Sequence, residues 1–168
     1  MLTTLTAPAF AKEWYIEDGD ITVKASGTEG KNKVSQGEDK DVEDTDTVIT
    51  NRHEGTASSN TVTIEAENKG DKVEVTLKDL NIDATSRGYK DPTDTGKAAV
   101  SVTGSGDTTI ELDGSNTLKS GSKYAGLEHN KTDTSGKLTI QDDNDKAGSL
   151  DATGGLRGAG IGGGEAQK

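Results

Sequence analysis

Cysteine is absent from the 168-residue chain, and aromatic residues make up only 3% of it. Without thiols the protein has neither a disulfide framework nor a thiolate metal site, a composition that is compatible with export. Long hydrophobic runs are also missing beyond the amino terminus, so we expect no membrane-spanning segment.

Large apolar side chains are scarce. Leu, Ile, Val and Phe together supply 28 of the 168 residues, and the net charge is −11. These values are typical of disordered chains, so an ordered protein needs a fold in which each short strand buries only one or two apolar side chains. The acidic balance argues against nucleic acid as a partner, because too few cations are present to neutralise phosphates. Polysaccharides and host glycoproteins stay open as partners of what we expect to be a monomer.

Residues 1–11 are the one stretch that is apolar without strand alternation, and they end in the small-x-small pattern Ala9-Phe10-Ala11. This pattern is typical of a signal-peptide cleavage site. We therefore expect a signal-peptide remnant over 1–11, a mature chain from Lys12, and a secreted or cell-surface location. The alternative is an ordinary disordered terminus.

An internal repeat is the strongest pattern in the sequence. It contains three kinds of short apolar segment that recur in the same order, each expected to form a strand. The first kind, which is followed by Asn, occurs at 75–77, 110–112 and 138–140; the second starts at Ile82, Leu118 and Leu150; the third ends at Val100, Leu127 and Ile161. Alternation with period two places the aliphatic side chains of each strand on one face.

Three strands per repeat predict an all-β fold, a right-handed parallel β-helix in which equivalent strands pair in parallel and corner Asn residues stack. The alternative is a β-sandwich, which short strands separated by turns also describe. We expect the domain to span 12–168, with a capping region over 12–60 and repeat coils over 60–168. The last glycines begin another element, so we expect the domain to be truncated there. The polar run 31–46 is interpreted as a solvated linker.

Catalytic constellations are not recognisable. The only histidines, His53 and His129, have no Ser or Cys partner at an identifiable spacing, and the glycine-rich stretches lack the features of a phosphate-binding loop. We therefore expect a protein that is not an enzyme and that carries no cofactor. The one metal candidate is a calcium site at Asp142, Asp143 and Asp145, because Ca²⁺ takes several oxygen ligands from flexible turns. Such a cluster is also common in ordinary solvated turns.

Aromatic side chains are the candidate ligand contacts, because sugar-binding sites combine aromatic platforms with polar groups. The candidates are Tyr89, in the longest insertion, Tyr124, which precedes a repeat element, and Trp14. For Trp14, together with Tyr15, capping the end of the core is the competing interpretation, and for Tyr124 it is packing at a corner.

Three stretches carry a family resemblance: Trp14–Ile21, Leu80–Asp83 and the run Gly158–Gly164. Together they resemble large secreted surface proteins of Gram-positive, often gut-dwelling bacteria that are described as carbohydrate-binding-domain-containing or adhesin-like. The resemblance implies a non-catalytic cell-surface β-helix and supplies no binding residues. Some such surface proteins bind host immunoglobulin.

The sequence therefore predicts a non-catalytic extracellular module that binds polysaccharide or mucin-type glycan. A host-protein ligand such as an immunoglobulin-binding domain, a structural stalk and, least favoured, a polysaccharide lyase are the alternatives.

Overall fold

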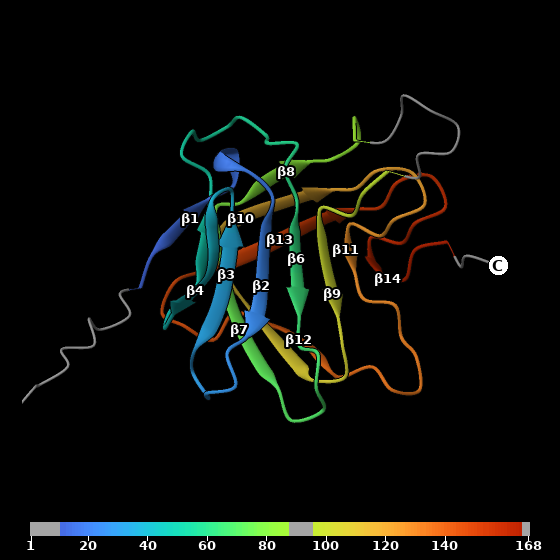
Figure 1. Cartoon of the computed structure of the whole chain (residues 1–168). Helices are drawn as coiled ribbons and strands as arrows, with labels where there is room; N and C mark the ends of the chain where they lie inside the picture. The colour runs from blue at the N-terminus through green and yellow to red at the C-terminus, as the bar shows by residue number, and fades with distance from the viewer. Residues whose placement is uncertain (1–10, 88–95, 166–168) are drawn as a thin grey trace, which may run out of the picture.

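The computed structural model describes residues 11–87 and 96–165 (Figure 1). The fold is all-β, as predicted, with one short 3-10 helix, η1 (Ile16–Asp18). The strands are β1 (Glu13–Tyr15), β2 (Ile21–Ala25), β3 (Asn32–Gln36), β4 (Asp39–Asp44), β5 (Val48–Thr50), β6 (Val62–Glu65), β7 (Lys72–Lys78), β8 (Asn81–Asp83), β9 (Val100–Thr103), β10 (Asp107–Lys119), β11 (Leu127–Glu128), β12 (Leu138–Gln141), β13 (Gly148–Thr153) and β14 (Ile161–Gly162). Across these described ranges, no helix has the length and apolarity that a membrane span requires.

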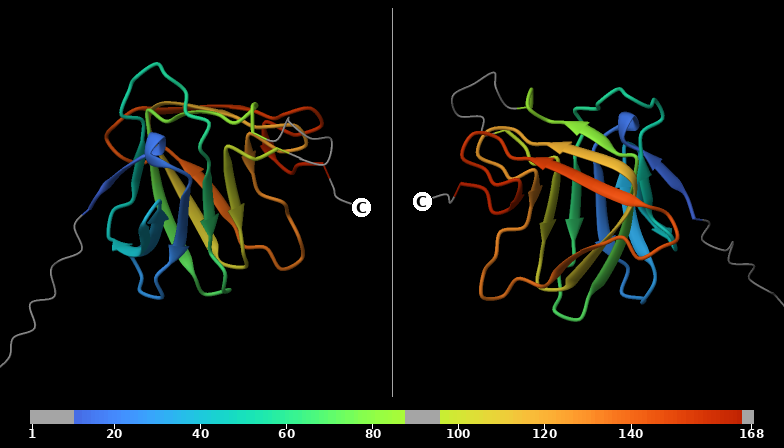
Figure 2. Two further views of the ribbon diagram at one scale, coloured as in Figure 1. Left: turned by 45° about the horizontal axis from the view of Figure 1, so that its top comes forward. Right: turned by 180° about the vertical axis from the view of Figure 1, so that it is seen from behind.

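The strands form two seven-stranded sheets. The first has the order β1-β5-β7-β10-β12, with β8 and β13 also paired to β10, and all its pairings are parallel. The second has the order β14-β11-β9-β6-β2-β3-β4 and is parallel as far as β2, then antiparallel from β2 to β4. Figure 1 shows β3, β2, β6 and β9 side by side, and Figure 2 shows β10 and β13 from behind.

The predicted right-handed parallel β-helix with three short strands per coil is wrong. Strand β10 is a single 13-residue strand that runs through both Ile110 and Leu118, which the repeat assigns to separate strands on either side of a corner. In addition, the antiparallel strands β2, β3 and β4 make the second sheet mixed. Two sheets enclosing one apolar core are compatible with the β-sandwich alternative.

Parallel pairing between equivalent repeat segments is present within these sheets. Leu127 pairs with both Val100 and Ile161, and Ile110 pairs with both Val75 and Ile140.

The second kind of segment keeps the expected register between β8 and β10, where Leu118 pairs with Ile82. It departs from that register between β10 and β13, and the corner Asn residues do not pair with one another. Leu118 pairs with Ala152, while Leu150 lies opposite Asn116. Asn81 pairs with Thr117. The buried side chain of Asn116 instead accepts a hydrogen bond from the backbone N–H of Leu80 at 2.9 Å, so it satisfies a buried backbone group.

The polar run 31–46 forms β3 and β4, so its interpretation as a linker is wrong. Val34 of β3 lies opposite Val23 of β2 and is fully buried. The turn before β3 contains Gly27 and Gly30, whose φ angles of 82° and 77° favour glycine. One buried valine and this glycine-containing turn order a segment whose other side chains are mostly polar.

The core is thin and layered, because strand alternation directs one aliphatic row from each sheet inwards. It is closed at the end formed by the amino-terminal strands, where Trp14 is fully buried and its Nε1 donates to Asp44 Oδ2 at 2.7 Å. The last layer is more open: Ile140 and Leu150 are half-buried, and Ile161 is 52% exposed.

Close packing of β13 on β10 depends on Gly148. A Cβ at this position would overlap the carbonyl oxygen of Leu112, so any other residue would separate the two strands.

The layered core predicts unequal effects of one substitution at two paired positions. Ile110→Ala should reduce the free energy of unfolding by about 2–5 kcal/mol, because it leaves a cavity in a fully buried layer. Ile140→Ala, at the half-buried partner position, should cost clearly less. Urea unfolding measures both values, and equal losses would contradict the layered core.

Asp20 joins three distant parts of the chain. Its Oδ1 accepts the backbone N–H of Thr61 at 2.9 Å, and its two oxygens accept hydrogen bonds from Arg87 at 3.1 Å each. The ammonium group of Lys97 lies 3.5 Å from Oδ2. Burial by itself raises the pKa of Asp20, but these hydrogen bonds and positive charges outweigh it and lower the pKa to about 2.

Because the pKa of Asp20 is lower in the folded than in the unfolded state, ionised Asp20 stabilises the fold at pH values above its unfolded-state pKa of 3.8. This stabilisation is lost as the pH falls towards 2. Asp20→Asn should therefore lower the Tm at pH 7, and the difference from the wild type should shrink below pH 4. Thermal unfolding at several pH values measures this difference. Asp151→Asn, on an exposed position of β13, is the control. A difference that stays constant down to pH 2 would disagree with this role.

Candidate functional site

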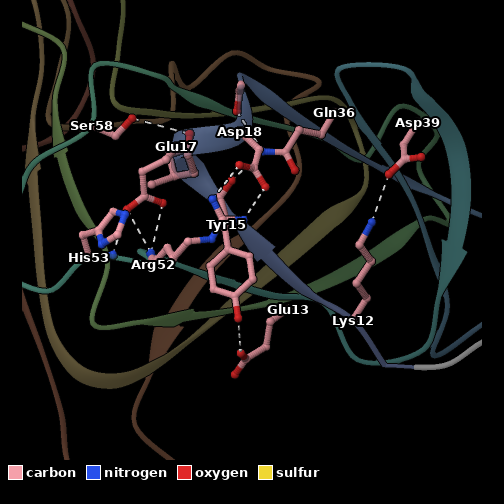
Figure 3. A network of polar contacts seen from close by, with 12 residues as sticks. Lys12, Glu13, Tyr15, Glu17, Asp18, Gln36, Asp39, Arg52, His53 and Ser58 are labelled. Atoms are coloured by element: carbon pink, nitrogen blue, oxygen red, sulfur yellow. Dashed lines mark hydrogen bonds and ion pairs between the residues drawn. The ribbon is translucent and has the colours of Figure 1, made fainter.

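A hollow of about 480 Å³ lies beside β1 and the turn between β3 and β4. We call it the Tyr15 hollow (Figure 3). Its lining residues are Lys12, Glu13, Tyr15, Asp18, Gln36, Gly37, Glu38, Asp39 and Arg52.

Strand alternation places Tyr15 at this surface. In β1 the side chain of Trp14 points into the core, so those of Glu13 and Tyr15 point to the other face. The phenol of Tyr15 donates to Glu13 Oε2 at 3.2 Å. The guanidinium carbon of Arg52 lies 4.5 Å from the centre of the Tyr15 ring, a cation–π contact that holds the ring in place.

Arg52 is itself fixed by carboxylates from η1. Its two terminal nitrogens donate to the two oxygens of Asp18, each at 2.8 Å, a bidentate geometry that restricts the guanidinium group. The backbone N–H of Arg52 donates to the Glu17 carboxylate at 2.9 and 3.0 Å. The Asp18–Arg52 hydrogen bonds raise the pKa of Arg52 and lower the pKa of Asp18.

The floor of the hollow is tied to the neighbouring hairpin. Gln36 Nε2 donates to the carbonyl oxygens of Tyr15 and Gly19 at 2.7 and 3.0 Å. Lys12 pairs with Asp39 at 2.9 Å, and its ammonium group lies 4.0 Å from the centre of the Trp14 ring. These contacts join β1, η1 and the β3–β4 hairpin into one preorganised surface.

The chemistry of the hollow suits a ligand that carries many hydroxyl groups. It combines an aromatic ring with carboxylates that accept hydrogen bonds and with cationic donors. Its four carboxylates outnumber its two cations, so the charge balance disfavours an anionic ligand. The Lys78 hydrogen bond lowers the pKa of Glu13 and the Arg52 hydrogen bond lowers that of Asp18, so both carboxyl groups are ionised acceptors at neutral pH.

The predicted ligand contacts do not meet at one place. Trp14 is fully buried beneath the Tyr15 hollow. Tyr124 is half-buried in the segment between β10 and β11. Tyr89 lies outside the described residues.

The predicted metal ligands Asp142, Asp143 and Asp145 are exposed in the loop between β12 and β13. Asp142 Oδ2 accepts the backbone N–H of Gly148 at 3.1 Å. Within residues 11–87 and 96–165, no group of three or more His, Asp or Glu side chains is placed to hold a metal ion. The structure thus does not bring these three carboxylates together as a site.

The two histidines lie in different places. His53 is exposed after β5, where its backbone N–H donates to Glu17 at 3.2 Å. The ring nitrogens of His129 lie 3.1 and 3.0 Å from the carbonyl oxygens of Val102 and Gly136. The ring of His129 therefore has backbone partners on both sides.

Comparisons with known proteins found no matching family model, no matching curated protein and no matching solved structure.

Proposed function

We propose that this chain is a non-catalytic extracellular module that binds polysaccharide or mucin-type glycan through the Tyr15 hollow. The observation that carries the proposal is the Tyr15 ring, held by the Arg52–Asp18 pair at a hollow of about 480 Å³.

Sugar rings have an apolar face of C–H groups and a rim of hydroxyls. A tyrosine ring offers the apolar face a packing surface. Asp18 and Glu13 beside it already accept hydrogen bonds within the protein, and their remaining lone pairs can accept hydrogen bonds from the rim. Preorganisation matters here, because a site whose side chains are already ordered loses less conformational entropy on binding.

The two carboxyl groups beside Tyr15 are better suited to accepting hydrogen bonds than to acid catalysis. A general acid needs a carboxyl group whose pKa is raised towards neutrality, whereas hydrogen bonds with Lys78 and Arg52 lower the pKa values of Glu13 and Asp18. The extracellular assignment rests on the Ala9-Phe10-Ala11 pattern, and the cysteine-free composition is compatible with it.

Removal of the Tyr15 ring should weaken glycan binding. On the best ligand from an array of plant, mucin and cell-wall glycans, Tyr15→Ala should lose about tenfold or more in affinity, roughly 1.4 kcal/mol. Tyr15→Phe should stay close to the wild type because the ring remains. Titration calorimetry measures the affinities, and Tm values confirm that each variant is folded.

Tyr124→Ala is the matched control, since it removes a half-buried tyrosine from a different part of the chain. An array without signal for any glycan, or equal losses for the two alanine variants, would count against the proposal.

A further inference from the structure

A second hollow, of about 470 Å³, lies on the first sheet over β7, β10 and β12. We call it the sheet groove. Its floor contains the paired row Thr76, Glu111 and Gln141, one residue from each strand, and the next row includes Glu74 and Thr109. The groove thus crosses three neighbouring strands, spaced roughly 4.8 Å apart.

One wall of the groove is fixed to the floor by Asn32. This side chain is 6% exposed, and its Nδ2 donates to the carbonyl oxygen of Glu74 at 2.7 Å and to Thr47 Oγ1 at 3.0 Å. These bonds hold the start of β3 and the segment before β5 against β7.

The opposite wall is fixed by Glu111. Its carboxylate accepts hydrogen bonds from the backbone N–H groups of Asp143 and Asn144 at 2.7 and 3.0 Å, and from Gln141 Nε2 at 3.0 Å. The loop after β12 is therefore anchored on β10. Because both walls are anchored, the groove is preorganised as an open channel.

Several polar groups in the groove have no partner within the described part of the protein. Among the described residues, the hydroxyls of Thr76 and Thr109 and the carboxylates of Glu74 and Asp143 have no hydrogen-bond or ion-pair partner. Hydroxyls both donate and accept, and carboxylates accept. This mixture can hydrogen-bond the hydroxyl groups of a sugar chain. The described residues that line the groove include no aromatic residue, so these polar contacts are the ones that would recognise the sugar.

The other ligand classes fit less well. The floor is a sheet face whose backbone groups are used in the strand ladder, so a peptide would find neither a free edge nor an apolar pocket for an anchor side chain. Five carboxylates against two lysines disfavour an anionic polymer.

We propose that the sheet groove binds a linear, uncharged oligosaccharide segment that lies across β7, β10 and β12. The inference extends the proposed function by adding a second site and naming the ligand class, and it does not depend on the Tyr15 hollow.

The test fills the groove without disturbing the core. Thr109→Trp places a large side chain on the outward face of β10, and Thr63→Trp, on the outward face of β6, is the matched control. The probes are neutral hexasaccharides of β-1,4-linked glucose, xylose and mannose, with hexagalacturonate as the anionic counterpart. Calorimetry on folded full-length variants measures affinity and stoichiometry.

We expect at least one neutral hexasaccharide to bind. Thr109→Trp should weaken its affinity for the sheet groove by at least about tenfold, and Thr63→Trp should leave this affinity unchanged. Hexagalacturonate should not bind. Tyr15→Ala should leave the affinity of the sheet groove for this hexasaccharide unchanged.

If Thr109→Trp binds with wild-type affinity and stoichiometry, the proposal that the sheet groove binds glycan is wrong. That result would not affect the proposal for the Tyr15 hollow. Loss of binding in Thr109→Trp with no effect of Tyr15→Ala would support the groove and overturn the Tyr15 assignment. The proposal for the sheet groove is also wrong if hexagalacturonate binds as tightly as the neutral hexasaccharides, or if no neutral hexasaccharide binds.

Discussion

Parallel hydrogen bonding along β10 is the interaction on which the rest of the structure depends. This 13-residue strand pairs with β7, β8, β12 and β13 and so joins successive repeats. With so few large apolar residues, each aliphatic side chain must be covered by its neighbours in the adjoining layers. Ile110, between Val75 and Ile140, is fully buried for this reason.

Both candidate sites lie on the outward faces of strands whose inward faces form the core. Because alternation sends one row of each strand inwards, the other row is available for polar contacts, as with Tyr15 beside Trp14 and Thr109 beside Ile110. The hairpin formed by β3 and β4 then supplies walls that a bare sheet face would lack. Asn32 and Gln36, at the two ends of β3, each fix one of the two hollows.

Sequence patterns predicted the pairing of Leu127 with Val100 and Ile161, because the repeat order is local and explicit. They did not predict that β10 is continuous, because Gly114 and Asn116 are residue types typical of a corner. They did not predict β3 either, because its one buried valine, Val34, is a weak signal of a strand. Alternation around Trp14 directs Tyr15 outwards, although the sequence interpretation grouped both aromatic side chains as a cap on the core. The contact of Tyr15 with Arg52 was not predictable, because distant residues meet only through the tertiary fold.

We propose that a two-sheet scaffold presents two glycan-binding surfaces. The most direct test is to map amide chemical-shift changes in NMR spectra while a bound glycan is titrated. If the proposal is right, the changes are confined to the lining of the Tyr15 hollow and of the sheet groove, and strands such as β9 are unaffected. Changes spread over the whole molecule, or confined to the open layer around Ile161, would contradict it.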